Sequence, residues 1–223
     1  MSTVAELTQA HRPVSETMSF QRKGYELAKR VIDCTVAAFL LVLFAPVFAI
    51  IALLIRLCDG GPVLFSQLRV GKGGRLFRCY KFRSMIVNAA AMQTKLDSKN
   101  QHSDSRTFKM RHDPRVTWIG RYLRKFSLDE LPQLWNVLIG DMSLVGPRPA
   151  LPSQVAEYSP RDRRRLEVTP GLTCIWQVSG RSELPFPVQV EMDIEYIENR
   201  SLALDFKLLL LTIPAVIYGR GAY

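Results

Sequence analysis

TVAAFLLVLFAPVFAIIALLI, residues 35–55, is the uncharged run that decides the architecture of this 223-residue chain. As a helix the run spans about 30 Å, roughly the hydrocarbon thickness of one bilayer. It is too long, and starts too far from the N-terminus, to be a cleavable signal peptide. A buried core helix is the alternative, but so long an apolar run is rare in soluble folds. The sequence therefore predicts a helix that enters a membrane.

Basic residues flank this run on both sides, whereas an ordinary membrane span carries them on its cytoplasmic side. Pro46, near the middle, lacks a backbone donor and clashes with the preceding turn, so the helix should kink there. A helix that bends at Pro46 and leaves on the side it entered would satisfy both flanks. A straight span with a tolerated proline is an equal alternative at this point. The flanking basic residues are Arg22, Lys23, Lys29, Arg30, Arg56, Arg69, Lys72, Arg75, Arg78, Lys81 and Arg83.

The chain as a whole is basic, with 30 lysines and arginines against 20 acidic residues and a formal net charge of +10. Such an excess favours anionic partners, namely nucleic acid, acidic lipid or phosphorylated substrates. The four cysteines show no CxxC spacing and lie in mainly apolar surroundings, which indicates reduced thiols. The three histidines have no ligand-like spacing with them, so no zinc site is expected.

Beyond the apolar run, the sequence predicts a mostly helical α+β fold with short strands. Strands at 63–65 and 76–80 flank a glycine-rich hairpin turn. Residues 97–112 are polar, and we expect a mobile loop there. The apolar run 208–218 is too short to span a bilayer and is either an interfacial helix or a helix docked on the core. Helices are predicted at 85–96, 116–125, 129–139, 154–158, 160–166 and 186–198, with a further strand at 173–178.

Asp129 and Glu130 are adjacent carboxylates at a predicted helix start. Ser127-x-x-Glu130 matches a capping box, and Pro132 is tolerated only in a first helical turn. The helix dipole would keep Asp129 ionised and able to act as a nucleophile, and a phosphate could dock beside it. Because two carboxylates repel a phosphate, Mg²⁺ or nearby guanidinium groups must offset their charge. Taken alone, the motif fits a plain helix cap better than a catalytic site.

Arg148 lies between Pro147 and Pro149, which fix the backbone and hold the guanidinium on a stiff mount. A planar fork held in this way suits bidentate phosphate binding. Lys81 and Arg83 offer two further cations on one face of a strand. The chain contains neither a Walker loop nor a GxGxxG motif, so nucleotide binding would use neither standard cradle.

Four motifs follow one another along the chain: KFRSM (81–85), DPRVTWIGRYLRKFSLDELPQLWNVLIGDMSLVGPRP (113–149), PGLTCIWQVSGR (170–181) and YIENRSLALDFKLL (196–209). Together they resemble the bacterial sugar transferases, which are monotopic phosphoglycosyl transferases. The resemblance covers about residues 25–223. It implies transfer of a sugar 1-phosphate from a UDP-sugar to a polyprenol phosphate, undecaprenyl phosphate, as the first membrane step of exopolysaccharide, capsule or glycan synthesis.

By this resemblance, Asp129 attacks the β-phosphorus of the UDP-sugar, expels UMP and holds the sugar phosphate as an acyl phosphate. The polyprenol phosphate then attacks that phosphorus, which implies ping-pong kinetics. Glu130 is the second catalytic carboxylate, and Mg²⁺ is implied with Asp129 as its ligand. The implied donor is UDP-glucose or UDP-galactose. The implied phosphate-binding positions are Lys81, Arg83, Arg124, Arg148, Arg181 and Asp193.

The family's anchor is a re-entrant helix broken at a proline, and Pro46 lies where that break belongs. The resemblance therefore favours the re-entrant form, although Ala45 stands where some relatives have serine. Three parts are implied: a disordered tail (1–24), a re-entrant membrane helix (25–58), and a small cytosolic catalytic domain with interfacial helices (59–223). The catalytic domain would lie on the cytoplasmic face of the bacterial inner membrane.

Two other functions stay open at this point. A membrane-anchored basic adaptor that binds acidic lipid or nucleic acid would use the apolar helix and the positive charge, but would leave Asp129 and Glu130 idle. A Mg²⁺-dependent phosphohydrolase would use the same carboxylate with water as the acceptor. The transferase hypothesis expects UDP-sugar, polyprenol phosphate and membrane lipid as partners and no nucleic acid, and it leaves homo-oligomerisation open.

Overall fold

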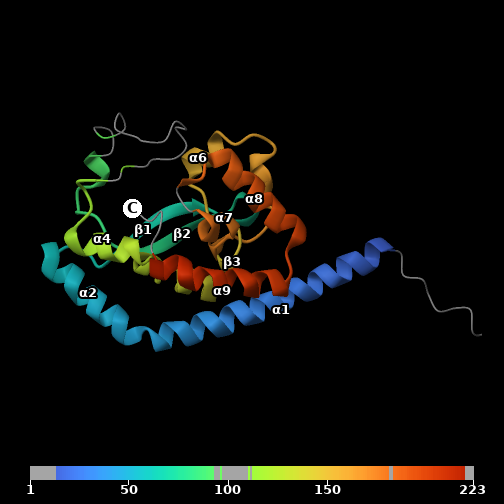
Figure 1. Cartoon of the computed structure of the whole chain (residues 1–223), viewed down its shortest axis with the longest axis horizontal. Helices are drawn as coiled ribbons and strands as arrows, with labels where there is room; N and C mark the ends of the chain where they lie inside the picture. Colours follow the sequence, from blue (N-terminus) through green and yellow to red (C-terminus); the bar gives the residue numbers. More distant parts are fainter. Residues whose placement is uncertain (1–13, 93–95, 97–109, 111, 181–182, 219–223) are drawn as a thin grey trace, which may run out of the picture.

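Two helices that meet at an angle run along one side of the structure, and the other elements form a body beside them (Figure 1). The computed structural model describes residues 14–92, 96, 110, 112–180 and 183–218. The helices are α1 (Val14–Leu43), α2 (Ala45–Asp59), α4 (Trp118–Lys125), α5 (Gln133–Ile139), α6 (Pro152–Ala156), α7 (Ile175–Ser179), α8 (Phe186–Asn199) and α9 (Leu202–Tyr218). The strands are β1 (Leu64–Val70), β2 (Leu76–Phe82), β3 (Ser143–Val145) and β4 (Gly171–Thr173). Short 3₁₀ turns are η1 (Lys72–Gly74), η2 (Ala90–Met92), η4 (Leu128–Glu130) and η5 (Asp162–Leu166).

The long apolar run bends at Phe44, and its two segments, Arg22–Leu43 and Ala45–Asp59, differ in direction by 60°. Pro46 lies in the first turn of α2, where it cannot donate the helical hydrogen bond to the carbonyl of Val42. The predicted kink is therefore confirmed. No single helix of the described residues is long and apolar enough to cross a bilayer, whereas the bent pair passes that test together. The pair is consistent with a re-entrant helix.

The helix pair starts earlier than predicted, because α1 begins at Val14 rather than near residue 25. Residues 1–13 of the predicted tail lie outside the described residues, as do most of the predicted loop at 97–112 and Arg181. Along the pair, large apolar side chains are exposed. They are Leu27, Val31, Ile32, Phe39, Val42, Leu43, Val47, Ile50, Leu53 and Leu57.

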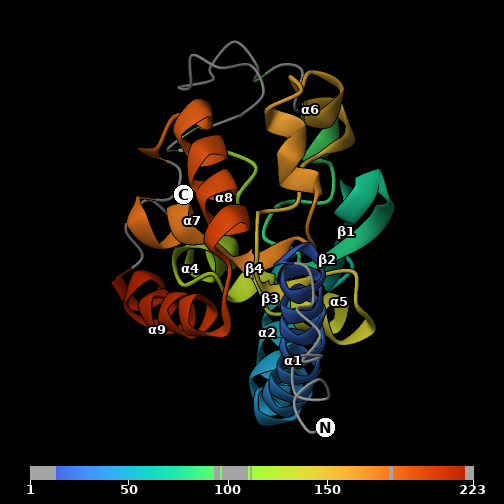
Figure 2. The ribbon, with the colours of Figure 1, turned by 90° about the vertical axis from the view of Figure 1, so that its right-hand side faces the viewer.

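Helix α9 combines the two arrangements predicted for the C-terminal apolar run. Asp205 and Leu208 are buried against the body, while the outer face is apolar and exposed. In Figures 1 and 2, α9 and the bent pair both lie toward the lower side of the molecule. Contiguous exposed apolar surface of this kind marks a membrane or protein contact. The exposed side chains of α9 are Leu202, Phe206, Leu210, Leu211, Ile213, Ile217 and Tyr218.

Strands β1 and β2 form the predicted antiparallel hairpin, which is longer than expected and pairs Leu64 with Phe82 and Val70 with Leu76. Strands β3 and β4 are parallel. Next to this pair, Gly146 and Gly171 approach so closely that a Cβ on Gly171 would lie 2.0 Å from the Gly146 nitrogen. Any larger residue at either position would force the two segments apart.

Several predicted elements are confirmed, and others are wrong. Helices α4 and α8 lie where 116–125 and 186–198 were predicted. The helix expected from residue 85 does not begin there, because Met85 pairs in a β-bridge with Val116. The strand expected at 173–178 is also wrong: β4 ends at Thr173, and α7 follows from Ile175. At Met85 a pairing between distant segments overrides the local pattern.

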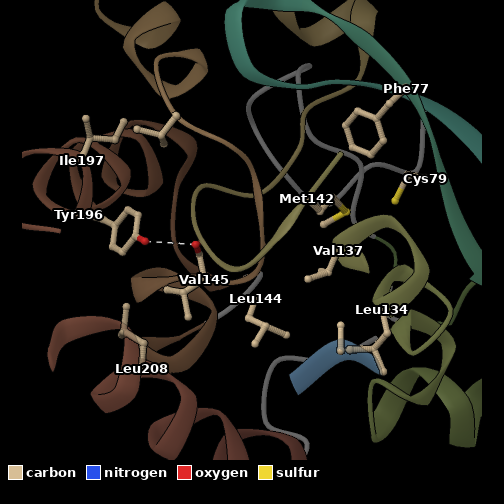
Figure 3. Close-up of a cluster of buried hydrophobic side chains, with 12 residues drawn as sticks. Phe77, Cys79, Leu134, Val137, Met142, Leu144, Val145, Tyr196, Ile197 and Leu208 are labelled. Atoms are coloured by element: carbon tan, nitrogen blue, oxygen red, sulfur yellow. Dashed lines mark hydrogen bonds between the residues drawn. The ribbon is translucent and has the colours of Figure 1, made fainter. Parts of the chain in front are cut away.

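The largest cluster of buried side chains joins α1, β2, α5, β3, α8 and α9 (Figure 3). Within it, the Tyr196 hydroxyl donates a hydrogen bond of 3.1 Å to the Val145 carbonyl, so α8 is tied to β3. A second cluster joins α2, β2 and α4. These clusters attach the bent helix pair directly to β2 and α4, which both contact the η4 turn. All four cysteines are free.

Candidate active site

Asp129 and Glu130 lie in η4, the short turn between α4 and α5. Ser127, which precedes the turn, has a φ of 54°, and among the described residues it alone outside glycine has a positive φ. The predicted capping box is wrong, because the Ser127 side chain caps nothing and α5 begins only at Gln133. The left-handed residue turns the chain sharply just before the two carboxylates.

Glu130 is held by two cations from other parts of the chain. Its Oε1 accepts hydrogen bonds from Lys81 Nζ at 2.5 Å and from Arg148 Nη2 at 2.6 Å. Arg148 Nη1 lies 3.3 Å from Oε2, so the guanidinium engages both carboxylate oxygens. Burial alone would raise the pKa of Glu130, but Arg148 and Lys81 outweigh it and hold the pKa well below its usual range. Glu130 is therefore a fixed anion that orients both cations.

Asp129 is the next residue, but the surroundings of its carboxylate differ from those of Glu130. It is 8% exposed, and no hydrogen bond joins its carboxylate to another side chain among the described residues. Burial, and then the charge of Glu130, raise the pKa of Asp129 to about 6, against the opposing effect of Lys81, Arg124 and Arg148. Burial and the neighbouring charges, rather than the expected helix dipole, therefore set the pKa of Asp129. It is nevertheless mainly ionised at neutral pH, and no described side chain engages it.

Arg124 reaches the site from the last turn of α4. Its Nε donates a 3.0 Å hydrogen bond to the Ser84 hydroxyl, and its charge lowers the pKa of Asp129. The approach depends on Gly120, one turn earlier, where a Cβ would lie 1.9 Å from the Ser84 carbonyl oxygen. α4 can pack against the end of the KFRSM segment only because this position has no side chain.

Two other predicted positions have different partners. Arg83 directs its guanidinium to both carboxylate oxygens of Asp59, and its Nε donates to the Pro62 carbonyl at 2.6 Å. Its contacts thus tie the end of α2 to β2. Asp193 is fully buried and pairs with Arg165 at 2.7 Å, and burial raises the pKa of Asp193 to about 6. The structure does not bring these two side chains into contact with Glu130.

The sequence analysis missed two residues that support the site. Arg69, in β1, donates a 3.0 Å hydrogen bond to the carbonyl of Pro149, next to Arg148. Burial, and then the Arg148 charge, lower the pKa of Arg69 to about 10. Asn136 is fully buried, donates to the Arg78 carbonyl at 2.7 Å and accepts from the Tyr80 amide at 3.1 Å. The sequence signal for these two hydrogen bonds is the polar Asn136 inside the apolar segment QLWNVLI.

The side-chain oxygens near Asp129 determine whether the implied Mg²⁺ fits this site. Among the described residues, no group of three or more His, Cys, Asp or Glu side chains could hold a metal ion. Mg²⁺ is commonly held by one or two carboxylates together with substrate phosphates, so the unpaired Asp129 fits such a site. Glu130 fits less well, because Lys81 and Arg148 engage its oxygens.

Comparison with known proteins adds to this geometry. The model of the family "Bacterial sugar transferase" matches residues 24–219. The chain belongs to the bacterial sugar transferase family. The resemblance based on the four sequence motifs is thereby confirmed, and a non-catalytic adaptor is no longer supported for this sugar transferase.

Three relatives illustrate the family. The galactosyl transferase CpsE of Streptococcus agalactiae serotype III is 44% identical over 210 residues, which make up 94% of this sugar transferase and 46% of CpsE. The exopolysaccharide production protein ExoY of Rhizobium meliloti is 40% identical over 200 residues, 88% of each chain. The undecaprenyl-phosphate glucose phosphotransferase of Komagataeibacter xylinus is 43% identical over 212 residues, 88% of this chain and 37% of that protein. The chain thus spans about half the length of CpsE and most of ExoY.

Proposed function

We propose that this protein transfers a hexose 1-phosphate from UDP-galactose or UDP-glucose to undecaprenyl phosphate and releases UMP. The product would start an exopolysaccharide or capsule repeat. The observation that carries the proposal is the contrast between a reactive, unpaired Asp129 and the adjacent Glu130, which is clamped by Lys81 and Arg148. The names of the relatives CpsE, ExoY and the glucose phosphotransferase support the acceptor and the two donor sugars.

In the first step, a carboxylate oxygen of Asp129 attacks the β-phosphorus of the UDP-sugar. The bond from that phosphorus to the bridging oxygen breaks, and UMP leaves with the electron pair. The sugar phosphate stays on Asp129 as an acyl phosphate. Lys81, Arg124 and Arg148 would offset the charge of the diphosphate, and Glu130 would keep the first and last of these cations in place.

In the second step, a phosphate oxygen of undecaprenyl phosphate attacks the same phosphorus. The bond to Asp129 breaks, the free carboxylate is restored, and a sugar diphosphate linked to undecaprenol leaves. Two displacements at one carboxylate predict ping-pong kinetics. When bound, Mg²⁺ would neutralise part of the diphosphate charge, with Asp129 as its proposed protein ligand.

The exposed apolar surfaces of the bent helix pair and of α9 support a place at the membrane. We propose that residues 25–58 enter and leave on the cytoplasmic side and that 59–223 form the catalytic domain on that face. Tags fused to the two chain ends should then both be shielded in intact cells. A C-terminal tag that is reachable from outside would contradict this topology.

The function is tested by following UMP and the lipid product with the purified protein. Incubation with UDP-sugar alone should release about one UMP per enzyme, and mass spectrometry should find a hexosyl-phosphate adduct on the peptide that contains Asp129. Added undecaprenyl phosphate should then allow continuous, Mg²⁺-dependent turnover. Continuous UMP release without the lipid would instead indicate a phosphohydrolase. If no adduct forms on residue 129, the proposed nucleophile is wrong.

A further inference from the structure

Gln133 is a buried glutamine whose side-chain amide holds an unpaired hydrogen-bond donor. The residue begins α5 and is only 2% exposed. Its Nε2 is buried and has no hydrogen-bond partner among the described residues. Most buried polar atoms in folded proteins have a partner, so an unpaired one calls for an explanation, of which a missing ligand is one.

The neighbours of Gln133 along the chain show which way the residue faces. The backbone stays in the right-handed helical region between η4 and α5, and side chains three residues apart in such a segment lie on one side of it. Three residues before Gln133, Glu130 pairs with Lys81 of β2. Three residues after it, Asn136 exchanges hydrogen bonds with the backbone of β2. Gln133 therefore lies on the side that faces β2, between these two contacts and next to the Glu130 cluster.

Gln133 also follows Asp129 by one helical turn. Helical side chains lean toward the N-terminus of their helix, so the amide leans toward the turn that carries the two carboxylates. No hydrogen bond joins the Gln133 amide to the Asp129 carboxylate, and neither has another side-chain partner among the described residues. A phosphoryl group on Asp129 would bring oxygens that accept hydrogen bonds into this region.

We propose that Gln133 contacts the substrate, and that its Nε2 donates a hydrogen bond to a non-bridging oxygen of the phosphoryl group that Asp129 attacks. The inference rests on the proposed function, which supplies that phosphoryl group. The bond strengthens as negative charge builds up on the oxygen, so it speeds the reaction more than it tightens binding of the UDP-sugar. No proton moves, and the bonds that form and break are those of the two displacements. A neutral donor complements Lys81 and Arg148, whose charges are partly taken up by Glu130.

The test replaces Gln133 by methionine, which has a similar length but no donor. Gln189→Met is the matched control, because Gln189 is 6% exposed and its Nε2 already donates to the Leu184 carbonyl at 2.8 Å. The rate constant of the UMP burst and its KM are measured with UDP-sugar alone, and unfolding by denaturant gives the stability.

Gln133→Met should slow the burst about 10²-fold at an unchanged KM, because the lost bond acts mainly in the transition state. It should not lower the stability, since no hydrogen bond within the protein is lost. Gln189→Met should show the reverse, with a native burst rate per folded molecule and a lower stability. A native burst rate in Gln133→Met, or an equal slowing in both variants, would overturn the proposal. If Gln133→Met does not fold, Gln133→Glu, which replaces the donor by an oxygen, should slow the burst at least as much.

A sulfur-substituted UDP-sugar tests the contact itself. Sulfur, a poorer hydrogen-bond acceptor, replaces one non-bridging oxygen of the β-phosphorus in either of two diastereomers. Gln133→Met should slow the burst less with one diastereomer than with the other, because in that one the bond to the amide is already weak. Equal slowing with both would show that the amide does not contact this phosphoryl group. Absence of a UMP burst in the unmodified protein would instead refute the proposed function itself.

Discussion

Asp129 and Asp205 are both buried aspartates, but their surroundings differ in one decisive respect. Asp205, in α9, accepts hydrogen bonds from Tyr25 at 2.9 Å, from Lys29 at 2.8 Å and from Tyr196 at 2.7 Å. Asp129 receives none from the described side chains, although three cations lie near it. A buried carboxylate with hydrogen-bond partners helps to hold the fold together, whereas a buried carboxylate without them is a candidate for chemistry.

The side chains around Asp205 and those around Glu130 also have different roles in the molecule. The Asp205 cluster joins α1, α8 and α9 and so fixes the bent helix pair to the body. The Glu130 cluster joins β2, η4 and the Pro147–Arg148–Pro149 segment, and it leaves its neighbour Asp129 open. Substitution at the first cluster should therefore affect stability, and substitution at the second should affect chemistry.

The strongest test of this contrast is Asp129→Asn. The amide cannot form the acyl phosphate, so turnover should fall by about 10⁴-fold or more. The fold should be at least as stable as before at neutral pH, because a buried and unpaired charge is removed. Activity is measured as UMP release and stability by thermal or denaturant unfolding. Near-native activity in this variant would break the assignment of Asp129 as the reactive group.

Asp205→Asn should show the reverse pattern. It leaves the Lys29 ammonium without its carboxylate partner in a buried position, which should cost about 3 kcal/mol of unfolding free energy. The protein that remains folded should turn over at nearly the native rate per molecule. Unfolding by denaturant and activity per folded enzyme check the two statements. A large loss of rate without a loss of stability would mean that the two clusters do not have separate roles.

A smaller effect is expected for Arg148→Lys, which keeps the charge but removes the fork that engages both oxygens of Glu130. The value of kcat/KM should fall roughly 10²-fold. Arg161→Lys is the matched control, because Arg161 makes the same two-pronged contact with Glu191 on the exposed surface. Equal effects of the two substitutions would show that the geometry of Arg148 does not matter to the reaction.

The comparison also shows what the sequence could predict. The bend follows from Pro46 in an apolar run, and the hairpin follows from glycines between two strand-like segments, so both could be predicted locally. The pairing of Glu130 with Lys81 and Arg148 joins segments 49 and 18 residues away. The capping-box pattern could not reveal this pairing, because a cap is a contact between residues close in sequence. In the folded chain Glu130 pairs with the distant Lys81 and Arg148 instead.

The same limit applies to residues that were predicted for the site by motif alone. Arg83 lies in the KFRSM motif and Asp193 lies three residues before the YIENRSLALDFKLL motif, but their side chains pair with Asp59 and Arg165. Asn136 was passed over because it sits in an apolar helix, where its two partners on β2 become visible only in the folded chain. Motifs identify which residues belong together more reliably than they identify what each one touches.

The pH dependence gives the finest test, because it separates reactivity from stability at one group. The pKa of Asp129 rises from its ordinary 3.8 to about 6 on folding, so UMP release in the first step should fall to half as the pH drops to about 6.

The contribution of Asp129 to the free energy of unfolding should have the opposite pH dependence and increase as the pH falls. Between these two pKa values the folded protein holds a proton that the unfolded chain has lost, so the contribution of Asp129 to stability is greatest below pH 4 and is lost as the pH rises through 6. Asp129→Asn should remove this part of the stability slope. Glu130, whose folded pKa is held below its ordinary 4.5, stays ionised in the folded protein, and its titration in the unfolded chain adds the same opposing slope to both proteins. Identical stability slopes for the native protein and Asp129→Asn between pH 4 and 6 would show that the carboxyl group is not desolvated, and the contrast with Asp205 would lose its physical basis.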